Sequence, residues 1–490
     1  MLIRTPSAAP TTRRRLLRAL VAAGGLGAFG GGGTAAAAVP VRPSVPPPAG
    51  EGRGRAAPEP DLEKAREIRE EFLHAWRGYV RAAWGHDEVL PVSGGHREFF
   101  ATGHPVGLSI VEALDTHHLM GLDEETGRCV EWIEDRLDFG IDADFQVFEA
   151  TIRLVGGLLA GYLATRRRTL LELCTDLADR LLPAFTSSPT GMPYRFVNLR
   201  TGRVSGRIVP LAEVGTYALE FGVLSELTGD GRYRRAAGRA VREAVRRRSG
   251  LDLLATALDV ESGQWADRVA IAFDPPADSF YEYLWGAWEM FGDEECRDWF
   301  HLLTDAIVRH QAERSDGLLW FRHVDFRTGE VLGRRQSSLS VAVLPVGGDN
   351  ALAADYYRSW TAVADRHPVI PEVIDHRRLA VVDPGNQLRP EYANCAFELY
   401  WQTGDPFYRT TAWRYFRGLV AHHRVPGGYT VVTDATQRPV ARGDLCPAYV
   451  FAENFKWLYL LFADTPRFDY AHGYLSTEGK ALRGLRRGRA

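Results

Sequence analysis

The chain has 490 residues, 45% of them hydrophobic and 11% aromatic, which is enough to bury a large core and to form more than one domain. Residues 61–490 hold 51 Lys and Arg against 60 Asp and Glu, a formal charge of −9 that argues against nucleic acid as a partner. The five cysteines form no C-x-x-C pair, which argues against a zinc ribbon and a dense disulfide framework and leaves one disulfide open.

The first 60 residues differ from the rest in composition. Three arginines at 13–15 precede a short glycine-rich apolar segment, and the alanines at 36–38 offer small residues for cleavage. This pattern resembles a twin-arginine export signal, which we assign to residues 1–38. Residues 39–60 are rich in Pro, Gly and Ala and are expected to form a linker. We predict export to the periplasm, the cell surface or the medium, with no membrane anchor after cleavage, because the apolar segment is short for a membrane span.

Residues 145–160 are apolar on nearly every side of a helix and are expected to form a buried helix. The exceptions are Glu149 and Arg153, which lie four residues apart and share one helical face. A buried carboxylate is either paired or used in chemistry, so these residues alone leave two interpretations open: a structural ion pair, or a catalytic acid with its cation.

Helix breaks recur along the chain at intervals of 45 to 63 residues. In most of them a glycine ends one helix and an Asp or Thr caps the next, as in a tight connection between antiparallel helices. The breaks fall at 120–123, 166–169, 229–230, 292–293, 348–349, 404–405 and 463–464. Short β-hairpins are expected in the return loops 198–204, 259–265, 325–331 and 433–440. Seven helical hairpins predict a closed double ring of helices, since an open array would expose apolar faces at its ends.

A polar side chain stands near the start of each expected inner helix, of which residues 448–462 are the most apolar example. These side chains are Glu112, Glu149, Glu220, Asp278, Ser338, Glu391 and Glu453. The helix dipole favours acids at helix N-termini, which explains any one of them alone. Together with the surrounding aromatic residues, six carboxylates on one rim predict a sugar site, because glycoside hydrolysis needs an acid and a base. Clustered oxygens also suit Ca²⁺.

Other chemistries lack their motifs. The adjacent pairs at 117–118 and 422–423 place their histidines on different sides of a helix, and no H-E-x-x-H occurs. These histidines therefore do not predict a zinc site and are expected to be structural. The chain has no G-x-S-x-G, no P-loop and no G-x-G-x-x-G after a strand, which argues against serine hydrolase and nucleotide chemistry.

Six motifs occur in order along the chain. They are W-G-H-D-E-V-L-P-V-S at 84–93, A-L-D-T with M-G-L at 113–122, F-E-A-T-I-R at 148–153, D-S-F-Y-E-Y-L at 278–284, L-R-P-E at 388–391 and T-E at 477–478. This series resembles glycoside hydrolase family 47, the class I α-1,2-mannosidases, from about residue 65 to residue 478. Residues 278–283 are also similar to the ER degradation-enhancing mannosidase-like branch. The resemblance implies an all-α (α/α)7 barrel, dependence on Ca²⁺ and hydrolysis with inversion at the anomeric carbon.

The resemblance also implies roles for individual residues. Glu149 matches the general acid, Glu391 the general base and Asp278 a third catalytic carboxylate. Thr477 matches the threonine that binds calcium through its carbonyl and hydroxyl. The residues expected to hold the sugar or the waters on the calcium are Arg153, Glu220, Arg389, Glu453 and Glu478.

Several positions depart from the family pattern. Asn394 replaces a second Glu after L-R-P-E, which removes a negative charge beside the base. Ser338 replaces a histidine and Val341 a nearby cysteine, so the usual disulfide lacks a partner. Gly479 and Lys480 replace the common Ala-His after T-E. Sugar contacts at Asn394 and Ser338 are therefore expected to differ.

These observations predict a calcium-dependent, inverting exo-α-mannosidase that releases terminal α-1,2-linked mannose from high-mannose glycans of glycoproteins or from mannan. Residues 61–480 are the expected catalytic domain, acting as a monomer. Residues 481–490 are expected to form a basic C-terminal tail, which is solvated from Arg483 on. The main alternative is a catalytically weakened protein of the same fold that binds mannose glycans, which the departures at Asn394 and Ser338 support. A lyase or isomerase on acidic sugars ranks lower, because it would need basic groups for a uronate.

Overall fold

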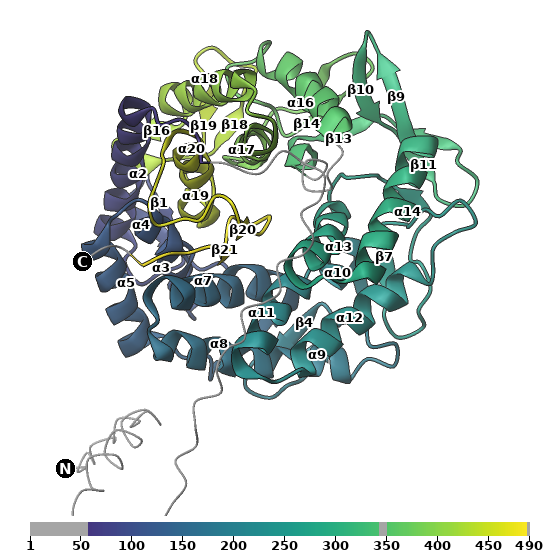
Figure 1. The fold of residues 1–490 in the computed structure, drawn as a ribbon, viewed down its shortest axis with the longest axis horizontal. Helices are drawn as coiled ribbons and strands as arrows, with labels where there is room; N and C mark the ends of the chain where they lie inside the picture. Colours follow the sequence, from purple (N-terminus) through teal and green to yellow (C-terminus); the bar gives the residue numbers. More distant parts are fainter. Residues whose placement is uncertain (1–56, 343–349, 488–490) are drawn as a thin grey trace, which may run out of the picture. The chain divides into compact units, whose positions relative to one another are not determined.

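The computed structural model describes residues 57–342 and 350–487. The predicted export signal, most of the predicted linker and the predicted break at 348–349 lie outside the described residues. Figure 1 shows the described helices following one another around a central axis, with short strands in the connections between them. The prediction of a helical fold with short β-hairpins is confirmed at this level.

The helices in the described part of the chain alternate between inner and outer positions (Figure 1). They are α2 (Leu62–Ala82), α3 (Leu108–Glu112), α4 (Leu114–Leu119), α5 (Asp123–Arg136), α6 (Val147–Glu149), the π-helical η1 (Ala150–Val155), α7 (Gly156–Thr165), α8 (Arg168–Leu181), α9 (Pro183–Thr186), α10 (Leu211–Gly215), α11 (Ala218–Thr228), α12 (Arg232–Val245), α13 (Asp278–Phe291), α14 (Glu294–Gln311), the 3-10 helix η2 (Ser338–Ala342), α16 (Asn350–Ala364), α17 (Glu391–Thr403), α18 (Pro406–His422), α19 (Tyr449–Ala452) and α20 (Asn454–Phe462).

The strands pair antiparallel in small sheets of two or three. They are β1 (Glu88–Leu90), β2 (Gly95–Arg97), β3 (Asp144–Gln146), β4 (Phe196–Asn198), β5 (Val204–Ser205), β6 (Ile208–Pro210), β7 (Ala257–Asp259), β8 (Val269–Ala270), β9 (Ala312–Ser315), β10 (Leu318–Phe321), β11 (His323–Asp325), β12 (Val331–Gly333), β13 (Arg335–Ser337), β14 (Val373–Asp375), β15 (Ala380–Asp383), β16 (Arg424–Val425), β17 (Gly428–Tyr429), β18 (Val432–Asp434), β19 (Ala441–Arg442), β20 (Tyr474–Leu475) and β21 (Ala481–Arg483). The predicted return loops connect or flank such strands.

Three of the predicted helix connections have the expected glycine cap, and two of these also have the aspartate cap. Gly229, Gly292 and Gly404 follow α11, α13 and α17 with positive φ angles of 75°, 67° and 68°. Asp293 and Asp405 then cap α14 and α18 by accepting a backbone N–H of the first turn. The helices on either side of each connection pack against each other, as predicted.

The break predicted at 463–464 does not connect two helices. Instead, α20 packs against α2, the first described helix of the chain, and the backbone N–H of Asp61 donates to the carbonyl of Phe462 at 2.8 Å. This prediction was wrong because the partner of the last inner helix comes from the other end of the domain. The position of a helix break in the sequence does not show that the packing partner of a helix lies at the other end of the domain.

Two of the predicted inner helices are interrupted. Residues 144–146 form β3, so the helix expected at 145–160 begins at Val147, and it passes through the π-helical η1 before continuing as α7. The helix expected at 448–462 is broken at Glu453, whose φ of −123° and ψ of −70° separate α19 from α20. Both interruptions fall beside predicted site residues, and the π-helical one is of a kind that is frequent at functional sites.

The apolar stretch Val147–Thr165 is long and apolar enough to cross a membrane by composition. However, 72% of its most apolar window is buried inside the described domain. Gly157 shows how closely it packs, because a Cβ there would lie 2.9 Å from the carbonyl oxygen of Val111. The stretch is therefore a core helix of the domain, held against α3.

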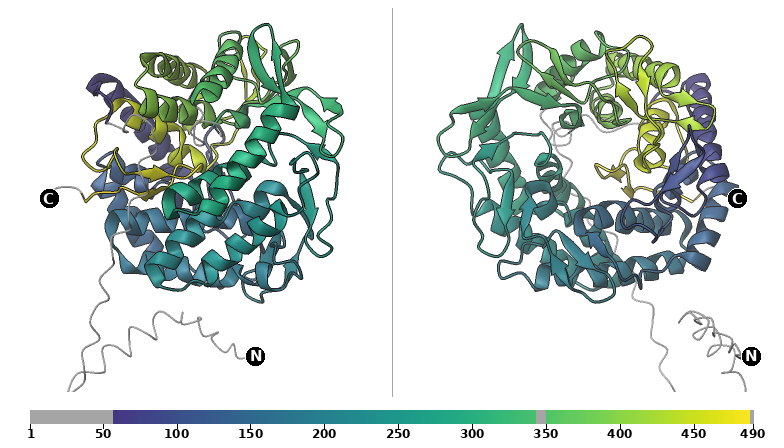
Figure 2. Two further views of the ribbon diagram at one scale, coloured as in Figure 1. Left: turned by 45° about the vertical axis from the view of Figure 1, so that its right-hand side comes forward. Right: turned by 180° about the vertical axis from the view of Figure 1, so that it is seen from behind.

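The C-terminal hairpin β20–β21 lies inside the ring of helices, both in Figure 1 and in the view from behind in Figure 2. Ala481 and Leu482 are buried and belong to β21, which ends at the half-buried Arg483, so the predicted basic tail 481–490 begins as a strand of the domain. The apolar side chains of this strand draw the end of the chain into the core. All five cysteines are buried and none is in a disulfide.

Candidate active site

Glu478 lies at the centre of the predicted rim carboxylates. It stands in the turn between β20 and β21, which lies within the ring of helices (Figure 1). Its charge interacts with carboxylates from six segments of that ring. These carboxylates are Glu112, Glu149, Glu220, Asp278, Glu282, Glu391 and Glu453. The structure thus brings together acids that are up to 366 residues apart in the chain.

Arg153 is the cation that three of these acids share. Its Nε donates to Glu149 at 2.7 Å, and its Nη1 donates to Glu478 at 2.8 Å and to Glu112 at 3.4 Å. The Arg153 side chain is only 11% exposed, and its guanidinium lies 5.6 Å from the ring centroid of Phe99. The predicted buried pair of Glu149 and Arg153 is therefore present, as part of a larger network.

Lys480 supplies a second buried cation. Its Nζ pairs with the other oxygen of Glu112, and both side chains are fully buried. Lys480 also reaches beneath Gly156, where it lies beside the stem of Glu220. Lys480, which departs from the family pattern, thus adds positive charge on the buried side of the acidic cluster.

The face of α13 contributes Asp278 and Glu282, which lie one helical turn apart. Burial raises the pKa of Asp278 to about 7 and that of Glu282 to about 8, although a hydrogen bond with Thr477 opposes the second rise. Burial also raises the pKa of Glu220 to about 8, opposed by the hydroxyl of Tyr283, which donates to Glu220 at 2.8 Å. Burial thus favours the protonated form of these carboxylates, and positive charge brought near would oppose it.

Glu391 begins α17 at the end of a firmly held segment. Leu388 adopts a left-handed φ of 62°, and its carbonyl accepts from Asn454 Nδ2 at 2.9 Å. Arg389 donates to Glu372 at 3.0 Å. Burial raises the pKa of Glu391 to about 8, and Arg389 opposes that rise. One oxygen of Glu391 is buried without a hydrogen-bond partner among the described residues.

Tyr449 links the two sides of the cluster. Its ring centroid lies 5.5 Å from the guanidinium of Arg153 and 6.0 Å from that of Arg389, distances typical of cation–π contacts. Its hydroxyl donates to the carbonyl of Gln387, just before the L-R-P-E motif. The arginines beside Glu149 and Glu391 therefore share one aromatic wall.

Comparison with known proteins identifies the family of the chain. The model of glycosyl hydrolase family 47 matches residues 71–484. The chain belongs to glycosyl hydrolase family 47. It is 32% identical to Alpha-mannosidase I MNS5 of Arabidopsis thaliana over 452 residues, which cover 85% of this chain and 76% of that protein. It is also 32% identical to mouse mannosyl-oligosaccharide 1,2-alpha-mannosidase IB over 480 residues, 91% of this chain and 74% of that protein.

A solved structure shares the fold. The alpha-1,2-mannosidase from Trichoderma reesei superposes with a TM-score of 0.79 at 23% sequence identity, covering 87% of this chain and all of that one. The predicted family is confirmed, and family 47 membership argues against the lyase or isomerase interpretation.

The residues around Thr477 fit the calcium ion that family 47 implies. Buried oxygens of Glu220, Glu282 and Glu391 lack hydrogen-bond partners among the described residues, and carboxylate, hydroxyl and carbonyl oxygens are the ligands Ca²⁺ prefers. In the described ranges, no three of these carboxylates bring oxygens within 4.8 Å of one another. They would therefore surround an ion at Thr477 through waters, as the resemblance implies for Glu220, Glu453 and Glu478.

Asn394 and Ser338, the two departures expected to change sugar contacts, lie in different surroundings. Asn394 is buried in α17 and lines a small cavity of about 10 Å³ together with Glu282 and Thr477. Ser338 begins η2, and its buried hydroxyl has no partner among the described residues. The substitution at Asn394 thus acts next to the candidate calcium position.

Some residues of the site were not predicted. Glu282 had a sequence signal, since it lies four residues after Asp278 on the same helical face. No sequence signal marked Glu372, the ion-pair partner of Arg389, or Tyr449, whose ring forms the aromatic wall. These residues lie 17 and 60 residues from Arg389 in the chain. Only packing brings them to the L-R-P-E segment.

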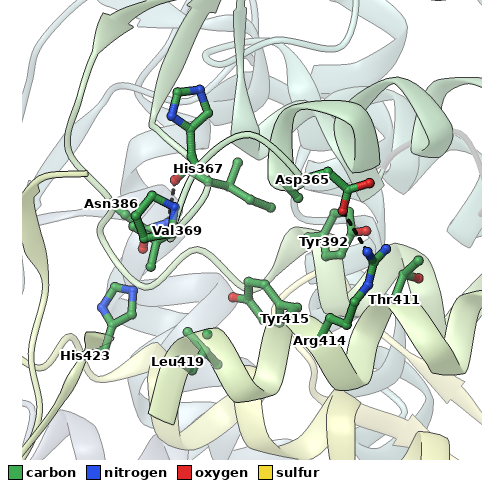
Figure 3. Close-up of a pocket in the computed structure, with 14 residues that line it drawn as sticks. Asp365, His367, Val369, Asn386, Tyr392, Thr411, Arg414, Tyr415, Leu419 and His423 are labelled. Atoms are coloured by element: carbon green, nitrogen blue, oxygen red, sulfur yellow. Dashed lines mark hydrogen bonds and ion pairs between the residues drawn. The ribbon is translucent and has the colours of Figure 1, made fainter. Parts of the chain in front are cut away.

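A separate pocket of about 280 Å³ lies behind the L-R-P-E segment. Figure 3 shows Tyr415 and Leu419 projecting into it from one helix, with the ion pair of Asp365 and Arg414 at one side. The Tyr415 hydroxyl donates to the carbonyl of Arg389 at 2.6 Å. Tyr415, which lines this pocket, thus holds the L-R-P-E segment in place. The pocket itself is not part of the acidic cluster.

Proposed function

We propose that this family 47 protein is a calcium-dependent, inverting exo-α-mannosidase that releases terminal α-1,2-linked mannose from high-mannose glycans or mannan. One observation carries the proposal. Arg153 binds both Glu149 and Glu478, which follows Thr477 in the chain, and the charge of Glu478 also acts on Asp278 and Glu391. The names of its relatives, mannosyl-oligosaccharide 1,2-alpha-mannosidases, support the substrate class.

In the proposed reaction, the carboxylic acid of Glu149 gives its proton to the glycosidic oxygen as the bond to the anomeric carbon breaks. Glu391 takes a proton from the water that attacks that carbon from the opposite face, so the product forms with inverted configuration. Glu391 has to be ionised for this step. Arg389 beside it favours the ionised form, whereas burial disfavours it.

Calcium held at Thr477 would supply positive charge that lowers the pKa of the surrounding carboxylates. Glu220, Glu453 and Glu478 would hold its waters and the hydroxyls of the sugar. Arg153 keeps Glu149 oriented, because the guanidinium binds Glu149 and Glu478 together.

The contact between α2 and α20 supports closure of the helices into the (α/α)7 barrel that the family resemblance implies. We also retain the proposals that the protein is exported through its N-terminal signal and acts as a monomer. The weakened binding protein is less favoured, because both the acid and the base of the family pattern are present.

The experiment is a hydrolysis assay with the purified full chain on α-1,2-mannobiose. Mannose release with calcium, its loss with a chelator, and appearance of the β-anomer first by NMR are expected. No release from any α-mannoside, together with calcium-dependent binding that Glu391→Gln leaves unchanged, would establish the binding protein instead.

A further inference from the structure

Two histidines and a glutamate meet at the open end of the β1–β2 hairpin. One ring nitrogen each of His86 and His96 and one carboxylate oxygen of Glu98 all lie within 4.8 Å of one another. The Nδ1 of His86 lies 2.6 Å from Glu98 Oε1. The two imidazole rings stack with centroids 3.4 Å apart and planes 15° from parallel. Three potential metal-ligand atoms are thus already gathered.

The strand register explains this grouping. Val89 of β1 pairs with His96 of β2. His96 and Glu98 are two residues apart along an extended segment, so they project from the same face. Arg97 projects from the other face, where its guanidinium binds Glu88 at 2.6 Å. The Arg97 guanidinium therefore does not lie on the face that carries the two histidines and Glu98.

The cluster is held in place but open to solvent. Glu98 is 10% exposed and His86 34% exposed, while His96 is exposed. The Asp87 carboxylate accepts the backbone N–H groups of Phe99 at 2.9 Å and Val106 at 2.9 Å, which fixes the residues that follow His86 and Glu98. A ligand set fixed by its supporting residues loses little entropy when it binds an ion.

Glu98 lacks a permanent cation. Among the described residues its only ion-pair partner is His86, although its other oxygen accepts the backbone N–H of Asp87 at 3.3 Å. A carboxylate that is nine-tenths buried and paired only with imidazole is the kind of group that a cation would complete.

We propose that His86, His96 and Glu98 form a binding site for a divalent transition-metal ion, with Zn²⁺ as the preferred occupant. Two imidazoles and one carboxylate are a common protein ligand set for zinc, with water in the fourth position. Ca²⁺ takes oxygen ligands and has no preference for this site. The proposal is independent of the mannosidase function and of the calcium site.

The ion would join the loop before β1 to the end of β2. Phe99 follows Glu98 directly and packs on the guanidinium of Arg153. Binding would therefore fasten a segment of the wall that faces the candidate active site.

The test is calorimetric titration of the untagged, metal-stripped full chain with Zn²⁺ in the presence of excess Ca²⁺. One ion per chain is expected. His96→Ala and Glu98→Gln should weaken binding by at least about tenfold, the loss that even an outer partner of a metal site can cause. His104→Ala is the matched control, because His104 is an exposed histidine on the following loop, and this variant should bind as the unaltered chain does.

A spectroscopic measurement separates this site from adventitious binding. Co²⁺ in place of Zn²⁺ should give the visible absorption of a four-coordinate ion in the unaltered chain and in His104→Ala, and should lose it in His96→Ala. Zinc binding that is absent, or equal in the unaltered chain and in His96→Ala, overturns the proposal. His96 is exposed, so its replacement leaves the fold intact.

Discussion

The two sides of the candidate active site hold their carboxylates in different ways. On the side of α6 and η1, Glu149, Glu112 and Glu478 share Arg153, and Lys480 adds a second cation. On the side of α13 and α17, burial leaves Asp278 and Glu391 with raised pKa values. The first side is largely charge-balanced by the chain itself. The carboxylates of the second side need protons or a bound cation to balance their charge. An ion at Thr477 would supply that positive charge.

The largest effect is expected from Glu391→Gln. Removal of a general base should lower kcat by about 10²- to 10⁴-fold, with little change in stability, because Gln resembles the protonated carboxyl that burial favours. Hydrolysis of α-1,2-mannobiose and a thermal melt measure the two effects. Glu330→Gln, on an exposed loop, is the control. Full activity of Glu391→Gln would remove it from the reaction.

Lys480→Met tests the charge balance of the first side. Loss of one partner of a buried ion pair should destabilise the fold by about 3–5 kcal/mol in urea unfolding. The double variant Lys480→Met with Glu112→Gln should recover most of that loss, since no carboxylate is then left unpaired. Lys64→Met, whose pair with Asp61 is partly exposed, should cost about 1 kcal/mol or less. Equal costs for both lysines would contradict a buried charge network.

Arg153→Leu asks whether the first side also serves the chemistry. Without the shared cation, Glu149 should keep its proton to higher pH, which should move the alkaline limb of the kcat/KM profile upward by about one pH unit, because Glu149 has to be protonated as the general acid. Arg180→Leu, which breaks an ion pair on α8, should leave the profile in place. A profile that Arg153→Leu does not change would return Arg153 and Glu149 to a purely structural pair.

A smaller effect is expected from pH on the calcium-free protein. Glu220, Glu282 and Glu391 keep protons in the folded state up to a pKa of about 8, whereas in the unfolded chain they release them near pH 4. Their contribution to stability is therefore full at acid pH and is lost as pH rises from about 5 to about 8.

Thermal melts across that range should show the decline, and Glu391→Gln should make it shallower because one titrating group is gone. Added calcium should restore stability at the upper end, since a ligand that binds only the folded state stabilises it. A melting temperature that rises with pH in the calcium-free protein would show that these carboxylates are ionised without the ion.

The sequence by itself determined most of the helical hairpins, the glycine and aspartate caps of some of them, the acids near the inner helix starts, and the family. All of these rest on spacings of a few residues, which set the face of a helix or the conformation of a turn. Glu149 and Arg153 were predictable as a pair for the same reason.

Only the tertiary structure decided which of these groups share charge. The burial of Ala481 and Leu482 carries Glu478 and Lys480 into the ring, where they meet Arg153 and Glu112. The break at Glu453, the packing of α20 on α2 and the meeting of His86 with Glu98 likewise follow from tertiary packing. The apolar faces that drive such packing join segments distant in the chain, and no local spacing records the result.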